Sequence, residues 1–143
     1  MLEFFIPTNR KTERGNPTGL DGMNELVAAE RLGKRVGNGM KKRNGKHAEK
    51  HCKRAMDKCG WECPKRKCKV TLTFVEASRA RDPDNIYSGA KFILDGITKP
   101  RGKKQFGAGA IEDDSQRWID LRFGEILVDR EHPGCWVRIE EET

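Results

Sequence analysis

The sequence predicts an α+β fold in a single domain, 1–143, with a small mixed sheet of about four strands and helices packed on it. The run Cys68–Glu76 alternates apolar and polar residues, which is typical of a half-buried strand. Apolar residues then recur at helical spacing across 83–97. The chain of 143 residues is long enough for one hydrophobic core, and its predicted elements follow the order β-α-β-α-β-β.

The first predicted strand is Leu2–Ile6, which a proline ends. The polar stretch 8–20 contains glycine and proline and is predicted to be a loop. Residues 21–32 are predicted to form a helix that Asp21 caps and Gly33 ends.

A basic insert follows at about 33–67. Its glycine-rich part, 37–45, is predicted to be a flexible loop. Residues 46–59 show helical spacing, with small and apolar side chains on one face and basic side chains on the other. The basic face suits a phosphate backbone, although a face that only meets solvent explains the same pattern. It consists of Lys46, Lys50, Lys53 and Arg54.

The segment that follows the strand Cys68–Glu76 starts a second helix. Asp82 is the predicted N-cap, and Pro83 occupies the first helical position. Lys91 lies two turns after Asp84 on a common face, away from the apolar stripe. That stripe consists of Ile86, Ala90, Ile93, Leu94 and Ile97.

The remaining chain predicts one loop and two strands. Residues 98–110 are rich in glycine and basic residues, which predicts a mobile basic loop that could order on an anionic ligand. Residues 118–129 are predicted to form a strand with a bulge near Gly124, and 135–139 a last strand after a turn.

The charge is unevenly distributed along the chain. Charged residues make up 36% of the sequence and the net charge is +7. From Arg31 to Lys69 there are 15 Lys or Arg against three acids, a local charge of +12. From Ile111 onward ten acids outnumber four arginines, a local charge of −6. A basic segment of this density indicates a polyanionic partner, and the acidic part indicates metal-binding or solvated carboxylates.

The sequence does not favour a membrane-spanning or a secreted protein. No apolar run reaches the length of a membrane span, and the N-terminus lacks the pattern of a signal peptide. The five cysteines are an odd number, so free thiols in a reducing cytoplasm are expected. A zinc site built from Cys59, Cys63 and Cys68, with His51 or Cys52, is a weak alternative because the spacing is irregular.

Four aspartates are the candidate metal ligands: Asp82, Asp84, Asp113 and Asp114. Carboxylate oxygens are the ligands that Mg²⁺ prefers, and metal-assisted phosphodiester hydrolysis needs several of them. It also needs cations for the charge that develops on the phosphate, and Arg79, Arg81, Lys91 and the loop from Lys99 to Lys104 could supply these. Helix capping and solvated surface charge explain the same aspartates without catalysis.

Three motifs together resemble the RusA family of Holliday-junction resolvases. They are Asp82-Pro-Asp-Asn85, then Lys91 with Asp95-Gly-Ile97, and finally Asp113-Asp114-Ser-Gln116; an early Pro7-Thr-Asn9-Arg10 is also similar. The resemblance covers the first ten residues and about Lys67 to the end. Members are small, often phage-encoded, dimeric, Mg²⁺-dependent endonucleases of α+β fold.

The resemblance implies roles for individual residues. Asp82, Asp84 and Asp114 would be metal ligands and catalytic residues, Asp113 a neighbouring ligand, and Lys91 the catalytic lysine. Mg²⁺ is the expected cofactor, with Mn²⁺ as a substitute, and no small-molecule cofactor is expected. The expected partners are a four-way DNA junction and a second copy of the chain, in the cytoplasm of a bacterium or a phage-infected host.

The sequence therefore predicts a Mg²⁺-dependent, structure-selective endodeoxyribonuclease that resolves Holliday junctions in recombination and repair. The alternative is a basic nucleic-acid-binding module without catalysis. In either case DNA would be held mainly through its phosphates. The predicted DNA contacts are Arg10, Lys46, Lys50, Lys53, Arg54, Arg79, Arg81, Lys103 and Lys104.

Overall fold

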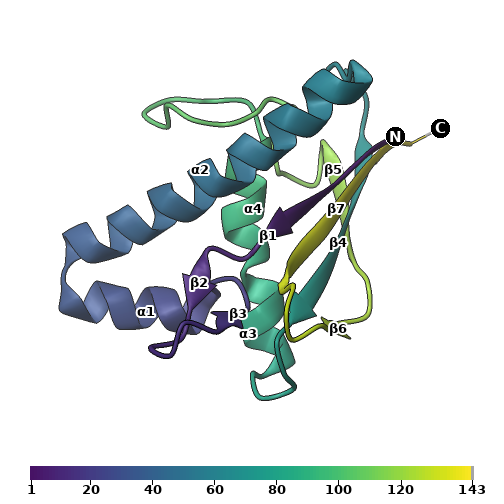
Figure 1. Ribbon diagram of the computed structural model, residues 1–143. Helices are drawn as coiled ribbons and strands as arrows, with labels where there is room; N and C mark the ends of the chain where they lie inside the picture. Colours follow the sequence, from purple (N-terminus) through teal and green to yellow (C-terminus); the bar gives the residue numbers. More distant parts are fainter. Residues whose placement is uncertain (143) are drawn as a thin grey trace.

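A mixed sheet forms one layer of the molecule and four helices form the other (Figure 1). The computed structural model describes residues 1–142. The strands run in the order β1-β7-β4-β5, and β6 pairs with β4 beyond the end of β5. Their bounds are β1 (Leu2–Pro7), β4 (Cys68–Glu76), β5 (Ile119–Phe123), β6 (Leu127–Val128) and β7 (Gly134–Glu141). The predicted α+β class is confirmed.

The central strand β4 has the bounds that its alternating sequence predicts. Val70 is paired with Ile139 of the antiparallel strand β7 and with Leu121 of the parallel strand β5. Two parallel strands need a crossover connection. Here the crossover contains α3 (Pro83–Ser88) and α4 (Ala90–Ile97).

The prediction of a loop at 37–45 is wrong, because α2 (Lys34–Cys59) is one continuous helix. Each glycine inside a helix costs about 1 kcal/mol relative to alanine. The structure shows what offsets part of this cost: a Cβ on Gly45 would lie 2.3 Å from the Phe106 ring. A Cβ on Gly96 of α4 would lie 2.4 Å from the Gly45 carbonyl oxygen. Gly45 therefore makes room for the Phe106 ring of the 98–110 loop, and Gly96 lets α4 approach α2 closely.

The helix predicted at 83–97 is interrupted at Gly89, which separates α3 from α4. A Cβ on Gly89 would lie 2.8 Å from the Asp21 carbonyl oxygen, so the loop that leads into α1 (Met23–Leu32) crosses at this point. The backbone N–H of Met23 donates to Ser88 Oγ at 2.8 Å. The helix break is thus also the point where α1 is attached.

Two other stretches differ in detail from the prediction. The expected loop at 8–20 contains a short hairpin of β2 (Arg10–Lys11) and β3 (Pro17–Thr18). The expected strand 118–129 is divided into β5 and β6 at Gly124, whose N–H donates to the Leu72 carbonyl. The loop at 98–110 is tied down where Thr98 bridges to Ile111.

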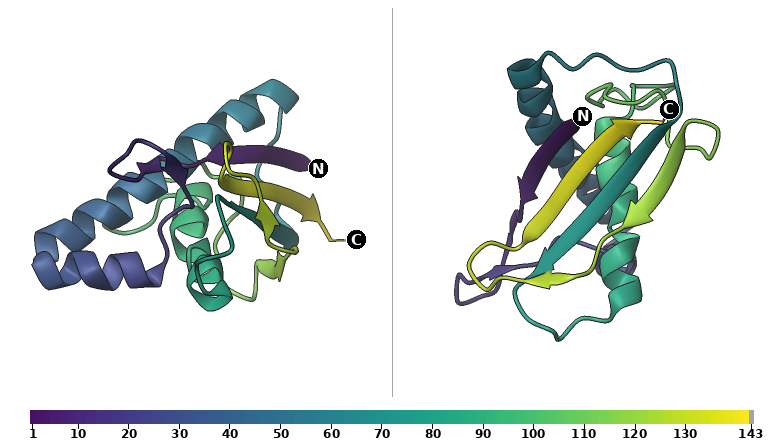
Figure 2. Two further views of the ribbon diagram at one scale, coloured as in Figure 1. Left: turned by 60° about the horizontal axis from the view of Figure 1, so that its bottom comes forward. Right: turned by 90° about the vertical axis from the view of Figure 1, so that its right-hand side faces the viewer.

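The core lies between the helices and one face of the sheet, and the described chain leaves the other face uncovered (Figure 2). Alternate residues of β1, β4 and β7 point toward the helices and are buried. No helix in residues 1–142 is long and apolar enough to cross a membrane. The largest buried side chains include Phe74, Leu2, Ile6, Leu72, Ile97, Ile111 and Ile139.

Candidate functional site

The predicted site residues lie at the two ends of the α3–α4 helix pair. Asp82 and Asp84 lie where α3 begins, beside the end of β4 (Figure 1). Asp113 and Asp114 follow Ile111, whose N–H donates to the Ile97 carbonyl at the end of α4. The helix pair between these ends is about 22 Å long at ~1.5 Å per residue. In residues 1–142 no three His, Cys, Asp or Glu side chains are placed to hold a metal ion.

The helix start at Asp82 has the predicted backbone but lacks the predicted side-chain cap. The carbonyl of Asp82 accepts the Ile86 N–H at 3.2 Å, and Pro83 occupies the first turn. The Asp82 side chain makes no capping hydrogen bond, and both Asp82 and Asp84 are exposed. Their carboxylates therefore remain available to solvent or to a ligand.

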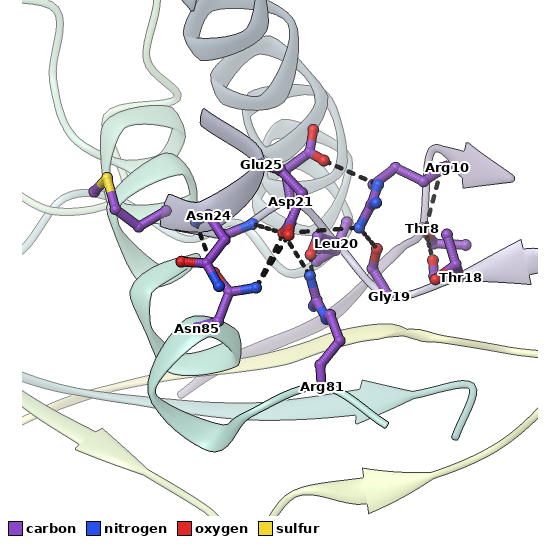
Figure 3. Close-up of polar contacts among 12 residues, drawn as sticks. Thr8, Arg10, Thr18, Gly19, Leu20, Asp21, Asn24, Glu25, Arg81 and Asn85 are labelled. Carbon is purple, nitrogen blue, oxygen red and sulfur yellow. Dashed lines mark hydrogen bonds and ion pairs between the residues drawn. The ribbon is translucent and has the colours of Figure 1, made fainter. Parts of the chain in front are cut away.

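Arg81, predicted to bind DNA, lies in an internal ion-pair network (Figure 3). Its Nε and Nη2 donate to the two carboxylate oxygens of Glu76 at 2.9 and 3.0 Å, and its Nη1 donates to Glu25 at 2.6 Å. Nη2 also reaches the Leu20 carbonyl at 2.7 Å. Glu76 is only 3% exposed, so this bidentate pair is buried on the carboxylate side.

The same network includes Arg10, another predicted DNA contact. Its Nε lies 2.9 Å from Asp21 Oδ1, and its Nη1 donates to the Gly19 carbonyl at 2.7 Å. Asn44 of α2 donates to Asp21 at 2.8 Å, and Asn85 of α3 donates to Glu25 at 3.1 Å. The β2–β3 hairpin, α1, α2 and α3 are thereby linked through polar side chains.

Sequence reasoning missed the carboxylates of this network, Asp21, Glu25 and Glu76. The sequence contains one indication of this network. Glu76 is the last residue of a strand, directly after the buried Phe74 and Val75, and Arg81 follows it after a short turn. A charge at the end of a buried strand needs a partner. The sequence does not show that this partner, Arg81, also binds Glu25, which lies 56 residues away along the chain.

A basic groove lies at the other end of the helix pair, between α2 and the 98–110 loop. Its walls consist of Asn38, Lys41, Lys42, Lys46, Asp95, Lys103, Lys104, Gln105 and Phe106. Three predicted DNA contacts, Lys46, Lys103 and Lys104, are thus brought together, while Lys41 and Lys42 were not predicted. In residues 1–142 no ion pair involves Lys41, Lys42, Lys46 or Lys103.

Lys104 shapes this groove. Its Nζ donates to the Asp95 carbonyl at 2.8 Å and to Thr98 Oγ1 at 2.6 Å, so a positive charge caps the C-terminal end of α4. The same ammonium lies 5.6 Å from the centre of the Phe106 ring, which packs on Gly45. These contacts hold the loop that presents the exposed Lys103.

Asp95 is the acidic side chain in the groove wall, and it was not among the predicted site residues. Burial raises its pKa above the usual value, the nearby Lys91 and Lys104 act in the opposite direction, and Asp114 raises it further. Asp95 and Asp114 are therefore electrostatic neighbours. The predicted catalytic lysine, Lys91, is exposed and lies one turn before Asp95.

The other predicted basic contacts are dispersed. Lys50, Lys53 and Arg54 continue along exposed positions of α2, where Lys53 lies 3.7 Å from Glu49. Arg79 is exposed in the turn after β4, at the end of the helix pair away from the groove.

In residues 1–142 the cysteines do not belong to any group of three side chains that could hold a metal ion. Cys52 and Cys68 are buried and Cys59 is exposed, and Cys63 Sγ lies 3.9 Å from a Glu112 carboxylate oxygen. Burial raises the pKa of Cys52 to about 12, so this thiol stays protonated at neutral pH. The zinc alternative gains no support from this arrangement.

Comparison of the chain with family models, curated proteins and solved structures found no match.

Proposed function

We propose that the protein is a structure-selective DNA endonuclease of the RusA type that resolves four-way junctions. The basic groove carries this proposal: four lysines that form no ion pair within residues 1–142 surround Asp95, with Asp114 as its electrostatic neighbour. The three motifs that resemble the RusA family lie on this helix pair and on the chain that follows it.

The groove supports binding to the phosphate backbone. Lys42 and Lys46 are one turn apart on α2, and Lys103 lies on the opposite wall. Each lysine that neutralises a phosphate releases a counterion, which gives affinity without sequence preference. Lys50, Lys53 and Arg54 extend the positive strip along α2 toward its C-terminal end.

The chemistry proposed for the groove is hydrolysis of a phosphodiester. The lysines would stabilise the negative charge that grows on the phosphate in the transition state. Mg²⁺ dependence rests on the resemblance, because the predicted ligands Asp82, Asp84, Asp113 and Asp114 do not converge within one described chain. The residues present in one chain thus do not fit a four-carboxylate metal centre.

The experiment is a cleavage assay on a four-way junction and on linear duplex of the same sequence, with Mg²⁺, Mn²⁺ or a chelator. We expect paired incisions in the junction that need the metal and are absent from the duplex. The Lys41→Ala/Lys46→Ala variant should bind the junction more weakly than the wild-type protein does. If the wild-type protein cuts the junction under none of these metal conditions, the nuclease proposal is rejected.

A second candidate is a DNA-binding module without catalysis. It is favoured by the separation of the acidic pairs across the helix pair. The same assay distinguishes the two, because a binding module would retard the junction on a gel at low salt and leave both strands intact in every metal.

A further inference from the structure

We propose that a groove between α1 and α2 binds an acidic, amphipathic helix of a partner protein. Helix α1 and the first half of α2, residues 23–43, form a helical arm that extends away from the sheet (Figure 1). An open groove of about 460 Å³ lies between the two helices of this arm and the start of β2. Binding at this groove requires neither DNA nor cleavage, so it goes beyond the proposed nuclease function.

Much of the groove lining is apolar and accessible. Ala28 and Leu32 are one turn apart on α1. Val36 and Met40 are one turn apart on α2. Leu32 is 79% exposed and Val36 is 45% exposed, although most apolar side chains of the chain are buried. Adjoining exposed apolar residues that line a groove are typical of a surface that binds another protein.

Contacts at both ends of the arm hold the groove in shape. At the inner end, Asn44 of α2 donates to Asp21 at 2.8 Å, and Arg10 Nε lies 2.9 Å from the same carboxylate. Near the turn the two helices touch, because a Cβ on Gly37 would lie 2.5 Å from Glu30 Cγ. A partner therefore meets two helices whose relative position is already fixed, which lowers the entropic cost of association.

The charge of the arm indicates an acidic partner. Residues 23–43 contain six Lys or Arg against two Glu, a local charge of +4. Arg43 lines the groove, and Arg31 and Arg35 are exposed on either side of the turn. None of these three arginines forms an ion pair within residues 1–142. Carboxylates of a partner would supply the missing counter-charges and orient the partner on the arm.

A helix fits this groove better than DNA or a second copy of the arm does. An amphipathic helix places apolar side chains at i, i+3, i+4 and i+7, and these enter an apolar groove between helices. DNA presents no such apolar row, and Asp21 and Glu25 at the inner end of the groove disfavour a phosphate. A second copy of the arm would bring two surfaces of charge +4 together, which is unfavourable.

Fluorescence anisotropy with the full-length protein and a labelled, designed peptide tests the groove. The probe is a helical peptide of about four turns, or ~14 residues, with leucine along one face and Glu, Gln and Ala elsewhere. One control peptide has the same composition in scrambled order, and another has Lys in place of Glu. We expect the wild-type protein to bind the probe roughly 10-fold or more tightly than either control, because only the probe matches both the apolar groove and the charge.

Two variants of the protein show whether the apolar groove itself is the binding site. Leu32→Ser should raise the dissociation constant of the probe roughly 10-fold, because it removes an apolar side chain that the helix would bury. Val27→Ser is the matched control, since Val27 is 40% exposed on the same helix but does not line the groove. It should bind the probe as wild type does. Far-UV circular dichroism and thermal unfolding check that both variants are folded.

A charge reversal tests the arginines. Arg35→Glu/Arg43→Glu should weaken probe binding roughly 10-fold or more. Lys65→Glu/Lys67→Glu changes the net charge equally at exposed positions outside the arm and should have a clearly smaller effect.

Four outcomes would overturn the proposal. The first is a wild-type protein that does not bind the probe at any soluble concentration. The second is equal binding by the wild-type and Leu32→Ser proteins, or of the ordered and scrambled peptides. The third is a wild-type oligomer in sedimentation equilibrium that Leu32→Ser dissociates, which would make a second copy the occupant. The fourth is a junction affinity that Leu32→Ser lowers, which would make DNA the occupant.

The peptide and cleavage experiments fail separately. A protein that cuts junctions but does not bind the probe would reject only the helix-binding groove. A protein that binds the probe but cuts no DNA would reject only the nuclease.

Discussion

The two ends of the α3–α4 helix pair differ in how their charges are compensated. At the α3 end, Arg10 and Arg81 form ion pairs with Asp21, Glu25 and Glu76, and most of these pairs are shielded from water. At the α4 end, Lys41, Lys42, Lys46 and Lys103 surround one half-buried aspartate. The charges at the α3 end compensate one another and link elements of the fold. The α4 end has an excess of positive charge that is available to a ligand.

The position of counter-charges, rather than the number of basic residues, thus distinguishes basic side chains that link elements of the fold from those that remain available to a ligand. Arg81 is followed directly by the Asp82-Pro-Asp84 motif, yet its donors are occupied by Glu25, Glu76 and a backbone carbonyl. In the loop of the other end, Lys99 and Arg101 pair with Glu112, whereas Lys103 has no such partner among the described residues.

The largest expected effect concerns the carboxylates at both ends. If the DNA-bound state brings the two ends together at one hard cation, which one chain alone does not, Asp82→Asn, Asp84→Asn and Asp114→Asn should each lower the single-turnover cleavage rate by roughly 10³-fold or more with junction affinity retained. Reduced rates in all three variants would show that the two ends cooperate in the DNA-bound enzyme. A reduced rate confined to Asp114→Asn and Asp95→Asn would restrict the chemistry to the groove. Full activity in all of them would end the assignment of the aspartates.

The second effect tests whether the α3 end is structural. Arg81→Ala should lower the free energy of unfolding by about 3–5 kcal/mol, since it leaves Glu76 buried without its partner. Urea denaturation measures this, with Arg79→Ala as the exposed control that should stay within ~0.5 kcal/mol of wild type. Arg81→Lys should rescue stability only in part because an ammonium cannot form the bidentate contact. A stable Arg81→Ala protein that no longer binds the junction would return Arg81 to the DNA contacts that the sequence predicts.

The sequence predicted the elements whose pattern is local. The strand 68–76 and the helical spacing of 83–97 depend on residues near one another, and both are found, with a break at Gly89. The helix across 37–45 was missed because glycine is a poor helix former, and the packing of Gly45 depends on Phe106, a residue far away along the chain.

The candidate site was only partly predictable for the same reason. Lys46 and Lys103 were recognised from composition, but their convergence depends on how the 98–110 loop folds onto α2. Asp95 was seen as part of a motif and not as a groove residue, because its burial arises from α2 and the loop together. The compensation of Arg10 and Arg81 likewise depends on acids from distant segments.

The third effect tests the groove as the phosphate-binding end. The triple variant Lys41→Ala/Lys42→Ala/Lys46→Ala should weaken junction binding, and the slope of log K against log salt should become shallower by about 0.9 for each phosphate that is no longer neutralised. The matched control removes the same charge at exposed lysines away from the groove, as Lys11→Ala/Lys65→Ala/Lys67→Ala. Fluorescence anisotropy over a salt series measures both. Equal slopes for the two triple variants would mean that only net charge matters.

The smallest effect separates two adjacent lysines of the loop. Lys104 donates to the Asp95 carbonyl and to Thr98 Oγ1 at the end of α4, whereas Lys103 is exposed and makes no ion pair in the described chain. Lys104→Ala should therefore lower the free energy of unfolding by about 1 kcal/mol, as expected for removal of a cation from a helix C-terminus. Lys103→Ala should leave stability within ~0.5 kcal/mol of wild type and make the salt slope shallower by about 0.9. Because the two variants remove the same charge from neighbouring positions, a difference between them cannot arise from net charge. If Lys103→Ala destabilised the fold and Lys104→Ala did not, the loop would hold these two side chains in the opposite roles, and the groove would lose the wall that Lys104 positions.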